Sequence, residues 1–219
     1  MEINPEFLTV AERYKLLIGT IVPRPIAFVS TVSLDGKLNL APFSFFNGVG
    51  SNPMTLLFCP GNKPDGAEKD TLRNCKPQSE GGTGEFVVNV ATEAYVREVA
   101  GAAEALPYGE SEFELTGLET APSQVVAPPR VASAPAAFEC RTLQVIRTNP
   151  GEAAAGNVVL GEVVHTFVAD DLLNDRGHID PEVLRAVGRM GGFGYTTTRD
   201  RFELRRGAEA LSAADPFGT

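Results

Sequence analysis

The fold is decided by residues 24–60, RPIAFVSTVSLDGKLNLAPFSFFNGVGSNPMTLLFCP. A run rich in β-branched and aromatic residues over 26–32 predicts a strand, and Asp35-Gly36 is a strong hairpin turn into a second strand over 37–47. A short apolar run over 54–59 is typical of a buried strand. The stretch therefore predicts an antiparallel hairpin followed by a third strand.

Short strands and turns continue through the rest of the chain. Thr9 can cap a helix and Glu12 can return the bond, so a helix is predicted over 9–18. The other predicted elements are a helical turn at 69–75, strands at 86–90, 137–148 and 157–169, helices at 92–106 and 181–187, and a glycine-rich loop at 188–198 that runs into a final strand. Residues 107–135 are rich in Pro, Ser and Glu and predict a long excursion over the surface or over a partner subunit. Many short strands with few helices indicate a mainly β fold, a closed or half-open antiparallel barrel with flanking helices.

Composition and charge limit the class of protein. With 219 residues, of which 43% are hydrophobic and 21% charged, the chain can form one good-sized core. No repeat or linker separates two cores, so we expect a single domain over 1–219 whose ends, 1–9 and 207–219, are frayed tails. The formal charge of −9 argues against nucleic acid or an anionic membrane as a partner.

Targeting and metal-binding signals are absent from the sequence. The N-terminus lacks the basic start and apolar run of a signal peptide, and no apolar stretch reaches the roughly 18 residues of a membrane span. Cys59, Cys75 and Cys140 stand far apart, and the chain has only 2 histidines, which disfavours a disulfide framework and a metal cluster. We therefore expect a cytoplasmic protein without a bound metal.

The second predicted strand carries the most informative polar pattern. Pro42 cannot donate to a ladder, so we expect the strand to change into a loop at Ala41-Pro42 and to leave neighbouring backbone groups free for a ligand. Short polar side chains surround this point, namely Ser30, Thr31, Asn39 and Ser44. Such a site suits a flat heterocycle whose edge alternates N–H and C=O groups. The alternative is a plain hairpin with a proline bulge, in which Phe43, Phe45 and Phe46 form an aromatic core.

A second pattern stands at the start of the helical turn predicted over 69–75. Lys69 brings a positive charge, Thr71 brings a hydroxyl, and the first turn of a helix has free backbone N–H groups. Together these groups, with Asp70 between them, could hold a phosphate. The alternative is an ordinary solvated helix cap.

Several sequence pieces, taken in order, resemble one protein family. They are RPIAFVST, DGKLNLAPFSFFNGV, SNPMTLLF, KDTLRN, EFVVNV, LGEVVHTFVADD and GRMGGFGYTTTRDRFELRR, and they cover roughly residues 10–206. The set resembles the flavin reductase-like, FMN-binding split-barrel family, in the manner of flavoredoxin. The resemblance implies a split β-barrel of antiparallel, Greek-key type. It also implies a homodimer with each flavin at the subunit junction.

The resemblance assigns roles to individual residues. Those expected around the isoalloxazine and ribityl parts of FMN are Ser30, Thr31, Asn39, Ala41, Pro42, Phe43 and Ser44, with Cys59 near the ribityl chain. Those expected at the phosphate are Lys69, Asp70 and Thr71. Those expected to close the site, from the partner subunit, are Arg189, Gly191 and Tyr195. The C-terminal loop matches less closely, because many relatives carry a different residue at Phe193, and residues 77–84 are hard to align.

His165 has two interpretations. It lies in the alternating strand pattern GEVVHTFV, which by default predicts a half-buried strand histidine. The alternative, on which we count it among the cofactor-binding residues, is a polar group lining the flavin face where a hydride donor docks, because its ordinary pKa lies near neutrality. The glycine-rich residues 80–84 and 188–194 neither follow a strand nor open a βαβ helix, so they are no dinucleotide fingerprint.

The resemblance implies an FMN-binding oxidoreductase, an NAD(P)H-dependent flavin reductase-like enzyme with NADH or NADPH as donor and a small-molecule acceptor. Because the flavin performs the difficult chemical step, we expect no catalytic nucleophile or acid–base pair in the chain, and the sequence has none that is recognisable. The alternative function is an FMN-binding electron carrier without efficient NAD(P)H turnover. A third possibility is a structural barrel without a ligand.

Overall fold

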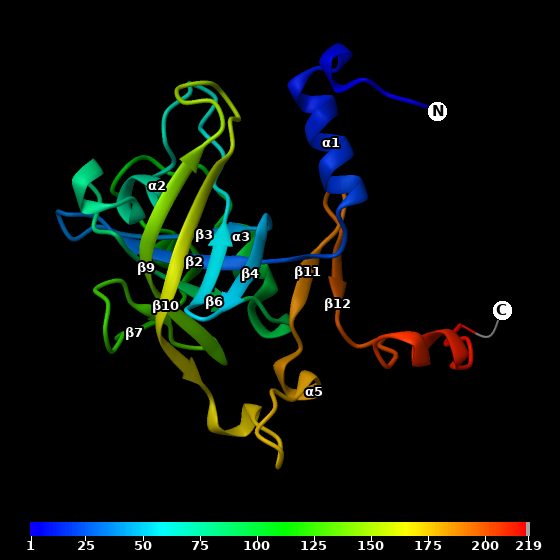
Figure 1. Ribbon diagram of the computed structural model, residues 1–219. Coiled ribbons are helices and arrows are strands. Elements are labelled where there is room, and N and C mark those ends of the chain that lie inside the picture. Colours follow the sequence, from blue (N-terminus) through cyan, green and yellow to red (C-terminus); the bar gives the residue numbers. More distant parts are fainter. Residues whose placement is uncertain (218–219) are drawn as a thin grey trace.

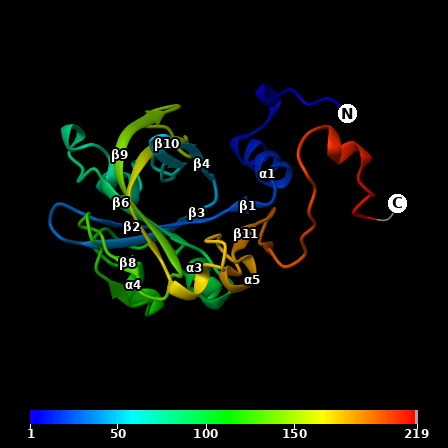
Figure 2. The ribbon, with the colours of Figure 1, turned by 60° about the horizontal axis from the view of Figure 1, so that its bottom comes forward.

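A single antiparallel sheet dominates the computed structural model, which describes residues 1–217. Its strands occur in the order β3-β2-β6-β9-β10-β5-β4. Their bounds are β2 (Ala27–Val32), β3 (Leu38–Phe43), β4 (Phe46–Ser51), β5 (Met54–Phe58), β6 (Glu85–Val90), β9 (Ala136–Arg147) and β10 (Asn157–Val168). Figures 1 and 2 show this sheet curled on itself, with the long strands β9 and β10 bending round one side. The edge strands β3 and β4 are consecutive in the chain but unpaired, so the barrel is split between them.

Smaller elements flank the barrel. A three-stranded sheet contains β1 (Arg24–Pro25), β11 (Val187–Arg189) and β12 (Tyr195–Thr197), and β7 (Thr120–Ala121) pairs with β8 (Arg130–Val131). The α-helices are α1 (Val10–Thr20), α2 (Asp70–Cys75), α3 (Val96–Gly101), α4 (Glu112–Thr116) and α5 (Pro181–Leu184). Short 3-10 turns cover Pro5–Phe7, Gln78–Glu80, Glu93–Tyr95, Asp170–Leu172 and Ala208–Ser212. No helix within residues 1–217 is long and apolar enough to cross a membrane.

The core lies on both faces of β2, because its side chains alternate. Phe28 packs with Tyr95 and Val99 on the side of α3, whereas Val29 faces the barrel interior with Phe58 and Phe86. Inside the barrel, the ring centroids of Phe58 and Phe86 are 5.2 Å apart. Buried side chains of α2, Leu72 and Cys75, join this interior cluster. The helix α2 is therefore anchored on the barrel, and its first turn faces the edge strand β3.

Most of the predicted elements are present. Thr9 and Glu12 form the expected capping box of α1, and β9 and β10 begin and end within one residue of their predicted bounds. The predicted helix over 92–106 is much shorter, because a 3-10 turn precedes α3, which ends at Gly101. The predicted helix over 181–187 stops at Leu184, since Arg185 takes a left-handed conformation and the chain enters β11.

The predicted strand over 37–47 was wrong, because it is two strands. The chain leaves β3 after Phe43 and enters β4 at Phe46, which pairs with β5 in a second hairpin. The expected change from ladder to loop at Ala41-Pro42 was also wrong, since Ala41 and Pro42 still pair with β2. The Leu40 N–H points away from β2, and backbone direction alternates along a strand, so Pro42 also turns its nitrogen to the open edge, where no donor is needed.

The excursion over 107–135 covers the chain's own sheet and includes α4, β7 and β8. The buried Glu139 carboxylate on β9 accepts backbone N–H bonds from Gln124, Val125 and Val126 at 2.8, 2.7 and 3.2 Å. The Ser30 hydroxyl donates to the Pro129 carbonyl at 2.5 Å. Three N–H groups gathered by one carboxylate fix a segment that has little regular structure. A partner subunit is therefore not needed to hold this segment.

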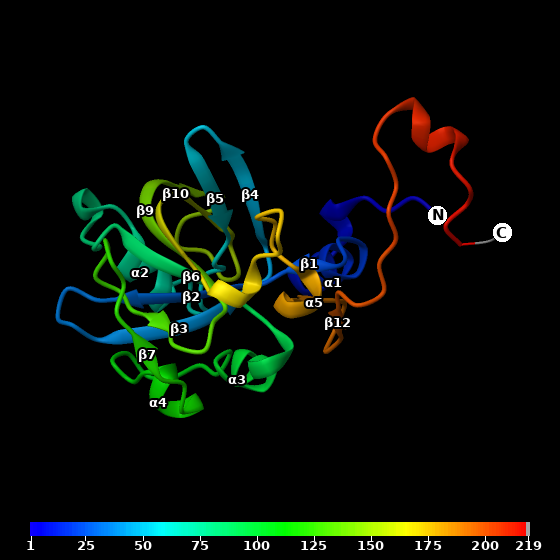
Figure 3. The same ribbon diagram turned by 90° about the horizontal axis from the view of Figure 1, so that it is seen from below.

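The two ends of the chain lie to one side of the barrel. Figure 1 shows α1 beside β11 and β12, and Figure 3 shows the C-terminal segment extending away from the barrel. Arg24 joins these parts, because its buried guanidinium donates to the carbonyls of Ile18, Ile21 and Met190 at 2.7, 2.7 and 3.0 Å. The frayed tail predicted for 207–219 stays a prediction, and residues 218–219 lie outside the described part of the chain.

Candidate functional site

A cavity of about 560 Å³ opens where the first turn of α2 faces the edge strand β3. The predicted site residues that line it are Asn39, Ala41, Pro42, Lys69, Asp70 and Thr71. Its other walls are the loop over 62–65, residues 102–106 after α3, and Glu112 of α4. The volume lies in the range of small-molecule sites, roughly 300–1,000 Å³. The structure thus gathers the two polar patterns of the sequence at one cavity.

Hydrogen bonds between side chains fix α2 against β2 and β3. The Asn39 amide donates to the Thr71 hydroxyl oxygen at 2.9 Å, and the Asn74 amide donates to that of Thr31 at 3.0 Å. These four side chains are buried. Because the Thr71 oxygen accepts the Asn39 bond, its hydroxyl hydrogen can donate to a ligand in the cavity.

Two lysines line the cavity in different electrostatic states. Lys63 pairs with Asp70, with Nζ 3.1 Å from Oδ1. Lys69 forms no ion pair with any carboxylate of residues 1–217, and its ammonium lies 5.9 Å from the centroid of the Phe43 ring. Desolvation and the charge of Lys63 lower the pKa of Lys69, although part of the side chain is exposed. The negative charge of an anion in the cavity would offset both effects on the pKa of Lys69.

Glu112 is a cavity residue that the sequence interpretation missed. It begins α4, is 7% exposed, and its Oε2 accepts the Leu40 N–H of β3 at 2.8 Å. Burial raises the pKa of this carboxyl, and the charge of Asp70 adds to the rise. In the sequence Glu112 looks like an ordinary acidic residue after a capping serine, so no local signal marked it.

Several predicted site residues do not line the cavity. Ser30 and Thr31 are buried in β2, and Phe43 belongs to the barrel core. Ser44 accepts a bond from the Arg24 Nε at 3.2 Å. Cys59 follows β5 and donates its backbone N–H to the Phe45 carbonyl at 2.8 Å, and burial raises the pKa of its thiol.

The predicted closing loop does not reach this cavity within one chain. The Arg189 guanidinium stacks on the Tyr195 ring, 4.5 Å from its centroid, and donates to the Gly192 carbonyl at 2.8 Å. Gly191 lies against α1, where an added Cβ would come 3.6 Å from the Gly19 Cα. The role assigned to this loop, in closing the site of a partner subunit, stays a prediction.

His165 is half-buried on β10 and does not line the cavity. Its register partner on β9 is Glu139, and cross-strand partners share a face of the sheet. Because the Glu139 carboxylate is directed to the backbone of residues 124–126, His165 lies on the outer face that this segment covers. Within residues 1–217, no group of three or more His, Cys, Asp or Glu side chains could hold a metal ion.

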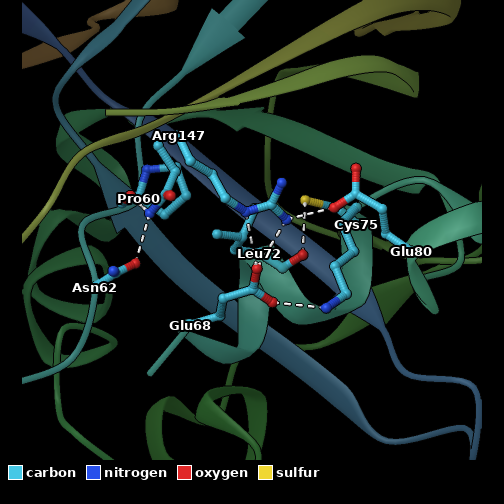
Figure 4. Close-up of polar contacts among 9 residues, drawn as sticks. Pro60, Asn62, Glu68, Leu72, Cys75, Glu80 and Arg147 are labelled. Atoms are coloured by element: carbon cyan, nitrogen blue, oxygen red, sulfur yellow. Dashed lines mark hydrogen bonds and ion pairs between the residues drawn. The ribbon is translucent and has the colours of Figure 1, made fainter. Parts of the chain in front are cut away.

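Ion pairs and hydrogen bonds fix the loop between β5 and α2, which forms one wall of the cavity (Figure 4). Glu68, directly before Lys69, accepts bonds from Lys76 at 2.8 Å and from Arg147 at 2.9 Å. Arg147 also pairs with Glu80 at 2.6 Å. On the same loop, Asn62 Oδ1 accepts a bond at 2.8 Å from the Asn157 amide. The loop between β5 and α2 is thus tied to the long strands β9 and β10, which holds one cavity wall in place.

The chain is similar to proteins from several bacteria. An uncharacterised protein of Halalkalibacterium halodurans is 44% identical over 207 residues, which cover 94% of this chain and 96% of that protein. The structure of nitrilotriacetate monooxygenase component B from Bacillus cereus has a TM-score of 0.85 at 38% identity, covering 93% of this chain and 98% of the other. The structure of 2-nitrobenzoate 2-nitroreductase from Pseudomonas fluorescens has a TM-score of 0.82 at 28% identity. The match covers 95% of this chain and 97% of the other.

The resemblance inferred from the ordered sequence pieces, and the split-barrel fold that it implied, are confirmed. Residues 19–182 match the family model of the flavin reductase like domain. This range includes β3, α2 and the cavity between them. The match to this family supports a flavin as the cofactor. The chain therefore belongs to the flavin reductase-like domain family.

Proposed function

We propose that the cavity between β3 and α2 binds FMN, with its phosphate at Lys69 and Thr71. The observation that carries the proposal is the ammonium of Lys69, which faces a cavity of about 560 Å³ without a carboxylate partner among residues 1–217. A phosphate would supply the missing negative charge and accept the Thr71 hydroxyl hydrogen. The donor set and the size of the cavity therefore fit the cofactor.

The open edge of β3 would align the flavin ring. Leu40 and Pro42 turn their backbone groups away from β2, and the Leu40 N–H is already taken by Glu112. The Pro42 carbonyl is then the next outward acceptor along the strand, with no N–H beside it. An acceptor on a rigid strand can fix one ring N–H in position.

Chromatography of the flavin released on denaturation tests the cofactor, and FAD as the main product would contradict the proposal.

We further propose that the protein is an NAD(P)H-dependent oxidoreductase of the flavin reductase kind. Bound FMN would supply the capacity to accept a hydride, while the chain binds and orients it. Two structural neighbours above 25% identity, a monooxygenase component and a nitroreductase by their names, support a redox role.

Anaerobic mixing with NADH or NADPH tests the redox proposal. The yellow absorbance should bleach at a rate that rises with nucleotide concentration. Bleaching by dithionite but by neither nucleotide would instead favour an FMN-binding electron carrier. A protein that stays colourless after incubation with FMN would contradict both functions.

We also propose a homodimer, in which Arg189, Gly191 and Tyr195 would close the partner's site. Its support is apolar surface on α1, where Val10, Tyr14, Leu17 and Ile21 are exposed at helical spacing. A groove of about 600 Å³ at the β4–β5 hairpin is a second apolar surface, with Phe46, Val49 and Met54 in its lining. The pairing would cover the open edge strand β4 as well.

A further inference from the structure

The carboxylate of Glu112 retains acceptor capacity beside the cavity. Its Oε2 accepts the Leu40 N–H at 2.8 Å, and the side chain lines the cavity while being only 7% exposed. An ionised carboxylate has about four lone-pair sites, so one backbone bond does not exhaust it. Burying a carboxylate costs free energy unless the charge is paired or hydrogen-bonded. The bond to the Leu40 N–H alone does not offset the free energy needed to bury this carboxylate.

The position of Glu112 points to a hydroxyl-bearing ligand group. Leu40, its backbone partner, follows Asn39, whose amide reaches the Thr71 hydroxyl at 2.9 Å. Because Glu112 lines the cavity and bonds to Leu40, its carboxylate lies at the β3 wall of the cavity. Asp70 is the nearby negative charge that raises the pKa of Glu112, and Lys63 already pairs with Asp70. A ligand hydroxyl can donate to the Glu112 carboxylate, whereas an anionic group in contact with it would be repelled.

Lys69 thus brings a cation to the cavity, and Glu112 brings an acceptor at its β3 wall. We infer that Glu112 recognises the hydroxyl groups of the polyol chain that joins the ring and the phosphate of the flavin. The inference rests on the proposed binding of FMN and deepens it, because it assigns the chain between the two ends of the ligand to a specific carboxylate. Carboxylates recognise ribose hydroxyls in dinucleotide sites by the same chemistry.

A series of three flavins tests this assignment. FMN has the ring, the polyol chain and the phosphate, riboflavin lacks the phosphate, and lumiflavin lacks the whole chain. Binding to wild type and to Glu112→Gln is measured by fluorescence titration at pH 8, and repeated at lower pH. Glutamine keeps an acceptor for the Leu40 N–H but removes the charge. The matched control is Glu114→Gln, an exposed glutamate on the same short helix.

Glu112→Gln should weaken FMN and riboflavin by the same factor, about tenfold, because charge-assisted hydrogen bonds are roughly twice as strong as neutral ones. Lumiflavin affinity should stay unchanged, and Glu114→Gln should change none of the three. An equal loss for all three flavins, a loss for FMN alone, or no loss would overturn the assignment. If Glu112→Gln does not fold, Glu112→Asp serves in its place. Its side chain is one methylene shorter, which draws the carboxylate back from the cavity, so FMN and riboflavin should again be weakened by the same factor and lumiflavin should not. A wild-type protein that binds none of the flavins would refute the proposed function itself.

Discussion

Replacing Lys69 by methionine tests the proposed phosphate site most directly. The ammonium forms no ion pair with another part of residues 1–217, and desolvation together with the charge of Lys63 lowers its pKa. Removing it should therefore leave the melting temperature of the protein without FMN unchanged or slightly raised. FMN binding should lose a hydrogen bond between charged groups, about 1.5–3 kcal/mol, or about 10- to 150-fold in affinity.

The assay compares FMN with riboflavin, which has no phosphate. Lys69→Met should weaken only FMN, so the ratio of the two dissociation constants should move toward one. Lys37→Met, at an exposed position after the first hairpin turn, is the control variant and should leave both affinities unchanged. An equal loss of FMN and riboflavin would refute the reasoning, because the lysine would then act on the ring or on the scaffold. A large fall in melting temperature would show that Lys69 is a structural residue.

Three other predictions concern packing, titration and assembly. Gly161→Ala should lower the free energy of unfolding by about 1–3 kcal/mol in denaturant titrations, because a Cβ there would lie 2.4 Å from the Phe86 Cζ. The raised pKa of Glu112 means that the folded state holds this proton more tightly than the unfolded state. The unfolding free energy of wild type should therefore fall relative to that of Glu112→Gln as pH rises above the ordinary pKa of 4.5. Parallel curves of unfolding free energy against pH would contradict this. Light scattering should show a dimer at micromolar concentration that Tyr14→Glu with Leu17→Glu dissociates, and a wild-type monomer that binds FMN tightly would contradict it.

Local signals predicted most of the fold. Asp35-Gly36 sets the first hairpin by turn chemistry, and the capping box of Thr9 and Glu12 marks the start of α1. The break between β3 and β4 at Ser44-Phe45 was not predicted, because the apolar pattern runs through it without a Gly or Asp turn signal. The break arises because Phe46–Ser51 pairs with β5 in a hairpin closed at Asn52-Pro53 and does not continue β3.

The candidate site was predictable only where its residues are close in sequence. Lys69, Asp70 and Thr71 are consecutive, so their chemistry could be inferred from one short motif. The Glu112 carboxylate meets its backbone partner across a separation of 72 residues, and α4 lies in a segment that was predicted to be irregular. A contact of this range is set by how α4 packs on β3, which no local pattern encodes.

The open edge of β3 connects the fold with the site. A sheet closed between β3 and β4 would use the outward backbone groups of Leu40 and Pro42 in a ladder and would leave no room for a ligand. The split exposes these groups instead, which is a liability in most edge strands. Here Glu112 takes the free N–H of Leu40, proline removes the next donor, and the cavity occupies the remaining edge. The unpaired edge of β3 thus lies at the candidate site, and Asn39, Pro42 and Glu112 gather there beside α2.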